Sequence, residues 1–134
     1  MVYIPKSDIN ISRAQMPQIS SKDVPTFLQQ LKKEGIAFRK KQLPVGILKP
    51  SQGEFNPDKI KKMMKDWQAV KDKPLLVSRD FYIIDGHHRY AGQLNDDPKS
   101  KITVIQVQLN VLDLIKKMHD FELSFTKQIH ESTK

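Results

Sequence analysis

The stretch that decides the fold reads Tyr82-Ile83-Ile84-Asp85-Gly86-His87-His88-Arg89-Tyr90-Ala91. Its apolar, β-prone start predicts a strand that breaks at Gly86, and Tyr90, Ala91 and Leu94 lie beyond the glycine at helical spacing. A strand that passes directly into a helix leaves the first N–H groups of the helix unpaired, and the helix dipole favours an anion there. The turn at residues 85–89 therefore has the geometry of a phosphate site.

The side chains of this turn suit phosphate chemistry. Arg89 offers a planar pair of donors that matches a phosphate, and His87 and His88 carry donors whose charge changes near neutral pH. Asp85, directly before the glycine, could hold a metal ion or accept a proton. A purely structural alternative fits the same residues: a turn at Asp85 and Gly86, two histidines at a helix start, and an arginine paired with an acid. The residues alone leave both interpretations open.

Further strands are predicted on either side of this turn. Residues 75–78 and 81–84 flank a two-residue turn, which is the pattern of a β-hairpin, and residues 102–109 predict another strand. Residues 36–48 are β-prone but interrupted by a proline and a glycine, so we expect one extended strand or two short ones. They lead into a turn-rich loop at residues 49–54.

Three other helices are predicted around these strands. The first is capped within residues 20–21 and ends at Gly35. The second starts at Asn56, where a capping residue precedes a proline, and ends near Val70. The third starts at Asn110. Its expected inner face consists of Val111, Leu112, Ile115 and Met118.

Composition indicates one globular domain. The chain has 134 residues, of which 38% are hydrophobic and 28% charged, enough to build a core. The absence of cysteine excludes a disulfide framework, a thiolate zinc site and thiol-based chemistry. His87 and His88 do not make a zinc site either, because adjacent helical residues point in different directions.

Charge and hydropathy indicate the kind of partner. Lys and Arg number 23 against 15 Asp and Glu, and the net charge of +8 favours polyanions such as nucleotides or nucleic acid. No apolar run reaches the roughly 20 residues of a membrane span, and the N-terminal residues lack the apolar segment of a signal peptide. We therefore expect a cytoplasmic protein with no membrane partner.

Several segments together resemble a known family. Residues 73–78, 81–91 and 102–107 match the core of the ParB/sulfiredoxin superfamily, in which two strands lead into a D-G-H-x-R or G-E-R-R helix start and a further strand. Residues 48–52 resemble the opening box of that family. The resemblance covers about residues 44–108. It implies an α+β fold, a ParB/sulfiredoxin-like single domain with a small mixed sheet flanked by helices.

The resemblance also implies which residues form the site. The residues implied to bind phosphate are Gly86, His87, His88 and Arg89. The implied catalytic residues are Asp85, Glu54 and His87, with Glu54 as candidate general base and Asp85 as candidate Mg²⁺ ligand. Ser51 and Gln52 lie in the loop that faces the same pocket in relatives.

Departures from known branches narrow the function. The sulfiredoxin cysteine is absent and His87 stands in its place, which excludes that chemistry. The chromosome-partition branch carries G-E-R-R and continues into further DNA-binding and dimerisation domains, for which the 26 residues after Gln108 are expected to leave no room. What remains resembles the short, stand-alone ParB-like nucleases, many of them in phages and mobile elements.

We therefore expect an enzyme, a nuclease or NTPase, that binds nucleotide or nucleic-acid phosphate at the turn, with Mg²⁺ assisting and ATP, ADP or CTP as candidate nucleotides. A non-catalytic regulator that binds DNA, RNA or a nucleotide is the alternative. A small-molecule kinase related to the free-serine kinases is a further one, although the substrate-binding segments of those kinases are not recognisable. The expected organisation is an extended arm at residues 1–19, the domain at 20–125 and a frayed tail at 126–134. The oligomeric state stays open.

Overall fold

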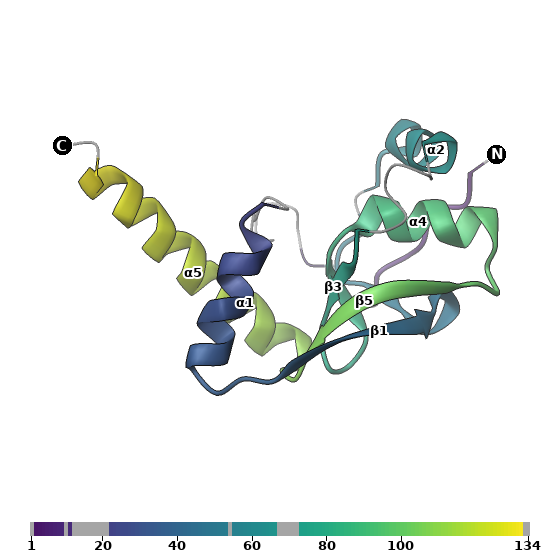
Figure 1. The fold of residues 1–134 in the computed structure, drawn as a ribbon. Helices are drawn as coiled ribbons and strands as arrows, with labels where there is room; N and C mark the ends of the chain where they lie inside the picture. The colour runs from purple at the N-terminus through teal and green to yellow at the C-terminus, as the bar shows by residue number, and fades with distance from the viewer. Residues whose placement is uncertain (1, 10, 12–21, 54, 67–72, 133–134) are drawn as a thin grey trace.

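The computed structural model describes residues 2–9, 11, 22–53, 55–66 and 73–132, with side chains described as far as residue 121. Within these residues the strands are β1 (Phe38–Pro44), β2 (Lys49–Pro50), β3 (Leu75–Val77), β4 (Tyr82–Asp85) and β5 (Lys101–Val107). The helices are α1 (Val24–Lys33), α2 (Pro57–Lys65), α4 (His87–Asp96) and α5 (Val111–Ser132), with a 3-10 turn, η2, at Val45–Ile47 (Figure 1).

The strands described form one mixed sheet. Their order is β1-β5-β3-β4-β2. The pairs β1–β5 and β3–β4 are antiparallel, whereas β3–β5 and β2–β4 are parallel. A small mixed sheet flanked by helices is the α+β architecture that the sequence predicts, and this prediction is confirmed.

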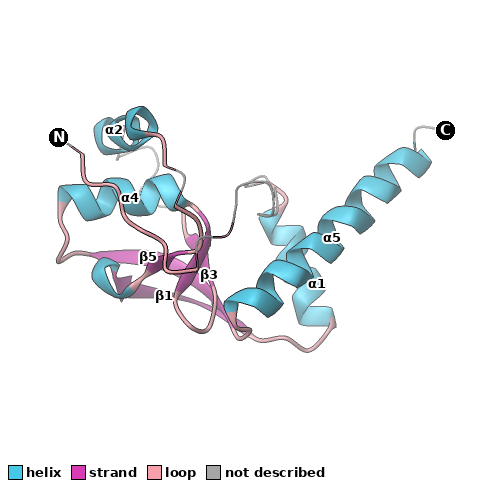
Figure 2. Cartoon of the chain, turned by 180° about the vertical axis from the view of Figure 1, so that it is seen from behind, coloured by secondary structure: helices cyan, strands magenta, loops and turns pink. Residues whose placement is uncertain are grey.

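Helices cover both faces of the sheet because its central strands bury side chains on both sides. Leu76 and Ile84 join a core with α1 and α5. Leu75, Val77 and Ile83 join a second core with α2 and α4. Neighbouring residues of β3 enter different cores because successive strand residues point to opposite faces. Figures 1 and 2 show α2 and α4 together on one side, with α1 and α5 side by side away from them.

The predicted hairpin is confirmed as β3 and β4. Its turn is closed by the Ser78 N–H, which donates to the Tyr82 carbonyl oxygen at 2.9 Å. The register shifts between Leu76 and Val77, and Leu76 pairs with Asp85. The hairpin thus places Asp85, the last residue of β4, directly beside β3.

Helix α2 begins as predicted and packs closely on α4. The Asn56 side chain accepts the Asp58 N–H at 2.9 Å, and Ile60 is fully buried. A β-carbon on Gly92 of α4 would lie 3.1 Å from Cβ of Met63, so the two helices meet closely at this glycine. Helix α2 ends at Lys65 rather than near residue 70, which lies outside the described residues.

Helix α1 starts later than predicted. It begins at Val24 with Asp23 as N-cap, and no side chain caps it. Residues 20–21, the expected caps, precede this start and lie outside the described residues. Its buried face consists of Phe27, Leu28 and Leu31. Its backbone turns at Gly35, which has a φ of 78°.

Helix α5 starts as predicted, and three of the four residues expected on its inner face, Val111, Ile115 and Met118, are buried. The Asn110 side chain accepts the Asp113 N–H at 2.9 Å. Leu112, expected on the inner face, is 66% exposed, whereas Leu114 is fully buried. Leu114 lies three and four residues from Val111 and Met118, which are also buried, so it shares their side of the helix. The helix continues to Ser132. No helix among the described residues has the length and apolar character needed to cross a membrane.

The described residues of the N-terminal arm are docked on the domain. Tyr3 donates its N–H to Asn95 Oδ1 at 2.7 Å, and Asn95 Nδ2 donates to the Tyr3 carbonyl at 2.9 Å. The Tyr82 hydroxyl donates to the Asp8 carboxylate at 2.8 Å. The arm therefore contacts both α4 and β4.

Candidate functional site

The first turn of α4 is open at its N-terminus. Gly86 is the N-cap, with a φ of 96° in the left-handed region and no side-chain cap. The helix starts where the Tyr90 N–H donates to the Gly86 carbonyl at 3.0 Å, so the N–H groups of residues 87–89 have no acceptor within the helix. A β-carbon on Gly86 would lie 2.5 Å from Leu75 Cδ2 and 2.7 Å from Arg89 Nη2. The left-handed conformation therefore favours glycine, and a β-carbon would in addition require the Leu75 and Arg89 side chains to shift.

His87 faces inward and holds the loop that follows β2. Its side chain is buried, and its Nε2 accepts the Ser51 N–H at 3.2 Å. The Ser51 hydroxyl donates to the Ile83 carbonyl at 2.6 Å. Burial, together with nearby His88, lowers the pKa of His87 to about 3. The imidazole is thus neutral near pH 7 and serves as an acceptor for the loop, and only its backbone N–H lies at the open end of α4.

His88 holds the other end of the same loop. Its Nε2 accepts the Asn56 N–H at 3.1 Å, directly before α2. The Phe55 ring stands edge-on to both imidazoles, with centroids 5.8 Å from His87 and 5.7 Å from His88. Both histidines therefore fix the loop at residues 51–56 against α4.

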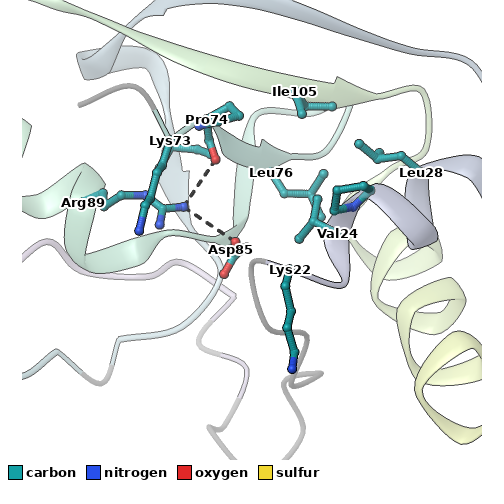
Figure 3. Close-up of a pocket in the computed structure, with 11 residues that line it drawn as sticks. Lys22, Val24, Leu28, Lys73, Pro74, Leu76, Asp85, Arg89 and Ile105 are labelled. Atoms are coloured by element: carbon teal, nitrogen blue, oxygen red, sulfur yellow. Dashed lines mark hydrogen bonds and ion pairs between the residues drawn. The ribbon is translucent and has the colours of Figure 1, made fainter. Parts of the chain in front are cut away.

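Arg89 points to the opposite side of α4. Its Nη2 donates to the Pro74 carbonyl at 3.3 Å and lies 3.6 Å from Asp85 Oδ2, as the dashed lines in Figure 3 show. Its Nε is buried and has no hydrogen-bond partner. Burial raises the pKa of the Asp85 carboxyl, while Arg89 and the Gly86 N–H oppose that rise. The guanidinium is thus held by long contacts and keeps one donor unsatisfied.

A pocket of about 480 Å³ adjoins this ion pair (Figure 3). It lies between the start of α1, strands β3 and β5, and the Asp85 and Arg89 side chains. Its apolar lining consists of Val24, Pro25, Leu28, Pro74, Leu75, Leu76 and Ile105. Its charged lining consists of Lys22, Lys73, Arg89 and Asp85. The pocket thus has apolar walls, and the three cations and one acid at its border give it a net positive charge there.

The predicted site residues therefore fall on two sides of α4. The histidine side comprises His87, His88 and the loop at residues 51–56, which includes Ser51 and Gln52. The arginine side comprises Asp85, Arg89 and the pocket. Gln52 has a buried Oε1 without a hydrogen-bond partner. Glu54 lies outside the described residues, so its expected role as general base stays a prediction.

Sequence patterns alone miss the contribution of α1 to the pocket. Lys22 and Leu28 reach the arginine side although more than fifty residues separate them from Asp85. Their sequence signal is that of a surface lysine and an amphipathic helix, which carries no long-range information. Lys73 and Pro74 did carry a signal, since they precede a strand that pairs with β4.

Asp85 is the predicted Mg²⁺ ligand. Within the part of the chain that is described, no group of three or more histidine, aspartate or glutamate side chains comes together. A single carboxylate, paired with Arg89 and with a raised pKa, does not form a metal site alone.

Comparisons with known proteins support the fold. No protein-family model matches this chain. No curated protein matches it either. Among solved structures the chain is similar to a Pnob8-like ParB-N domain, with a TM-score of 0.50 and 14% sequence identity. The match covers 67% of this chain and 38% of that one. At this identity the similarity shows a ParB-N-like fold and leaves the activity open.

Proposed function

We propose that this protein binds a nucleotide on the arginine side, with the phosphates against the first turn of α4. The observation that carries the proposal is the Nε of Arg89, which is buried without a partner. An unsatisfied buried donor costs free energy that an anionic acceptor restores. The N–H groups of residues 87–89, which lack helical acceptors, supply further donors at the same helix end.

The pocket suits the remainder of a nucleotide. Its volume of about 480 Å³ lies within the usual range for small-molecule sites. Pro74, Leu76 and Ile105 offer apolar surface to a base and ribose, while Lys22 and Lys73 add positive charge at the border. An apolar interior beside clustered cations matches a ligand with a flat organic part and a phosphate.

Mg²⁺ fits this site as a companion of the phosphates. Mg²⁺ commonly keeps several waters and takes one or two carboxylates together with phosphate oxygens. Asp85 lines the pocket and could give one such carboxylate. When bound, the ion would neutralise phosphate charge that Arg89 shares.

A finer proposal is that the protein also hydrolyses its ligand, as a nuclease or an NTPase. Arg89 and the N–H groups at the start of α4 could stabilise negative charge that develops on phosphorus. The His87 Nε2 already accepts the Ser51 N–H, so it is not available as a base. Among the described residues the geometry therefore favours nucleotide binding, and catalysis depends on whether Glu54 reaches the phosphates. Product analysis after incubation with each nucleotide, with and without an acceptor such as serine, separates hydrolysis, kinase activity and binding alone.

Calorimetry with ATP, ADP, CTP and GTP, with and without Mg²⁺, tests the proposal. We expect saturable binding of at least one nucleotide and a loss of roughly 10- to 100-fold in Arg89→Ala, because a hydrogen bond to a charged group disappears. Arg79→Ala is the matched control, since Arg79 is exposed on the hairpin turn and does not line the pocket. Thermal unfolding shows that both variants fold. Equal affinities of the two variants, or no binding by the wild type, would contradict the proposal.

Nucleic acid is a second candidate ligand, favoured by a different observation. Helix α2 exposes Lys59, Lys61, Lys62 and Lys65 to solvent. A backbone-binding face of this kind gives an affinity that falls steeply with salt. The double variant Lys59→Glu, Lys62→Glu should abolish duplex binding and leave the nucleotide affinity unchanged, as fluorescence anisotropy and calorimetry can measure. Unchanged duplex affinity in this variant would dismiss the α2 face.

A further inference from the structure

Strand β1 forms an edge of the sheet. It pairs with β5 along its whole length, from Phe38 to Pro44, and no strand in the described part of the chain lies on its other side. The register is continuous, without a bulge. A regular edge of seven residues offers roughly 23 Å of backbone for pairing.

The hydrogen bonds beyond both ends of β1 show which backbone groups face outward. The Gln108 N–H donates to the Ala37 carbonyl at 2.9 Å, and the Val45 N–H donates to the Ser100 carbonyl at 2.9 Å. Alternate residues of an antiparallel strand bond to the same neighbour, so the odd-numbered residues of β1 bond to β5. The residues whose N–H and carbonyl groups point outward are Phe38, Lys40 and Gln42.

The same edge carries concentrated positive charge. Arg39 and Lys40 are exposed and Lys41 is half-buried. The residues of β5 that pair with these three are Gln106, Ile105 and Val104, which are all uncharged. The ion pairs found in the described residues, Arg89 with Asp85 and Lys117 with Glu34, do not involve these three side chains.

We propose that β1 binds an acidic, extended segment of a partner protein, which adds a strand to the outer edge of the sheet. The outward N–H and carbonyl groups of Lys40 and Gln42 supply the ladder, and the three cations select acidic side chains on the incoming strand. A second copy of this chain would set its own cations against these, which is unfavourable. Neutral strands are likewise discouraged, because charges on an edge strand oppose unselective pairing.

Fluorescence anisotropy with a labelled octapeptide of alternating Glu and Val tests this proposal. We expect saturable binding, no binding of the matching Lys and Val peptide, and loss of binding when every residue of the acidic peptide is N-methylated. N-methylation removes ladder donors but keeps the charge, so undiminished binding of the methylated peptide would show charge attraction without strand addition and overturn the proposal. Sedimentation of the protein alone should show no self-association through this edge. A dimer abolished by Lys40→Glu would overturn the proposal as well.

Substitutions in the protein, rather than in the peptide, test the same edge. Lys40→Glu should weaken acidic-peptide binding about tenfold by placing like charges together. Gln42→Pro removes one outward N–H on an edge strand that tolerates proline, with an expected loss of about fivefold. Lys116→Glu, an exposed lysine on α5, is the matched control and should bind as the wild type. Equal affinity of Lys40→Glu and Lys116→Glu contradicts the proposal, and thermal unfolding of Lys40→Glu checks that its fold is intact.

Discussion

The two sides of the first turn of α4 are built from adjacent residues, yet the side chains that this turn contributes to them differ in what they leave unsatisfied. On the histidine side, His87 and His88 each accept a backbone N–H from the loop at residues 51–56. On the arginine side, Arg89 keeps a buried Nε without a partner and borders a pocket. Satisfied groups hold structure in place, whereas a buried donor without a partner is an exception that needs an explanation. Helix geometry thus divides one contiguous motif into an anchor and a side that borders the pocket.

The free energy of unfolding should depend on pH because of His87, which anchors the loop on the histidine side. The pKa of His87 is about 3 when folded, against 6.5 as the ordinary value, so the group is neutral in both states above pH 6.5. As the pH falls from 6.5 towards 3, the unfolded chain binds a proton that the folded chain does not, and stability falls by up to about 1.4 kcal/mol per pH unit. Denaturant unfolding at several pH values measures this slope. His87→Gln, which keeps an acceptor but does not titrate, should show a smaller slope. An identical slope would show that His87 does not cause the pH dependence.

Gly86 is the N-cap of α4, whose first turn contributes to both sides. Its replacement should therefore disturb both sides. Gly86→Ala adds a β-carbon in contact with Leu75 and Arg89 at a positive φ, with an expected loss of about 3 kcal/mol of stability. Gly35→Ala is the matched control, because Gly35 also has a positive φ but nothing lies within 4 Å of the added carbon. We expect that control to lose only about 1 kcal/mol. Equal losses by thermal unfolding would show that backbone strain, and not the packing at the turn, makes glycine necessary.

The smallest effect is expected from a substitution of Asp85, on the arginine side. Burial raises the pKa of this carboxyl even beside Arg89, so the neutral Asp85→Asn side chain is well accommodated. Removing the acid also frees Arg89, and without Mg²⁺ the affinity for nucleotide should rise by about two- to fivefold. Calorimetry with and without Mg²⁺ decides the role. A fall in affinity confined to the Mg²⁺ series would identify Asp85 as a ligand of the ion.

Local signals predict much of this fold because each acts over a few residues. The cap at Asn56, the hairpin at residues 75–84 and the break at Gly86 all depend on neighbours along the chain, and each lies where the sequence indicates. Errors arise where tertiary packing decides. Leu112 satisfies a helical spacing but faces solvent, because packing of α5 on α1 and the sheet selects the side that carries Leu114.

The site is predictable in its residues and not in its arrangement. The sequence brings Asp85, His87 and Arg89 together, but it does not show that the His87 side chain is buried against Ser51. It does not show either that α1 supplies Lys22 to a pocket beside Arg89. Both facts depend on contacts between segments far apart in the chain, and a single sequence has no local signal for them.

The N-terminal arm bears on the order in which this chain folds during synthesis. Tyr3 is fastened to Asn95, 92 residues later, and Asp8 to Tyr82, 74 residues later. Closing loops of this length costs entropy before any contact repays it. Tyr3 and Asp8 therefore cannot make these contacts until α4 and β4 have been synthesised, so the arm docks only after most of the elements between them have been made.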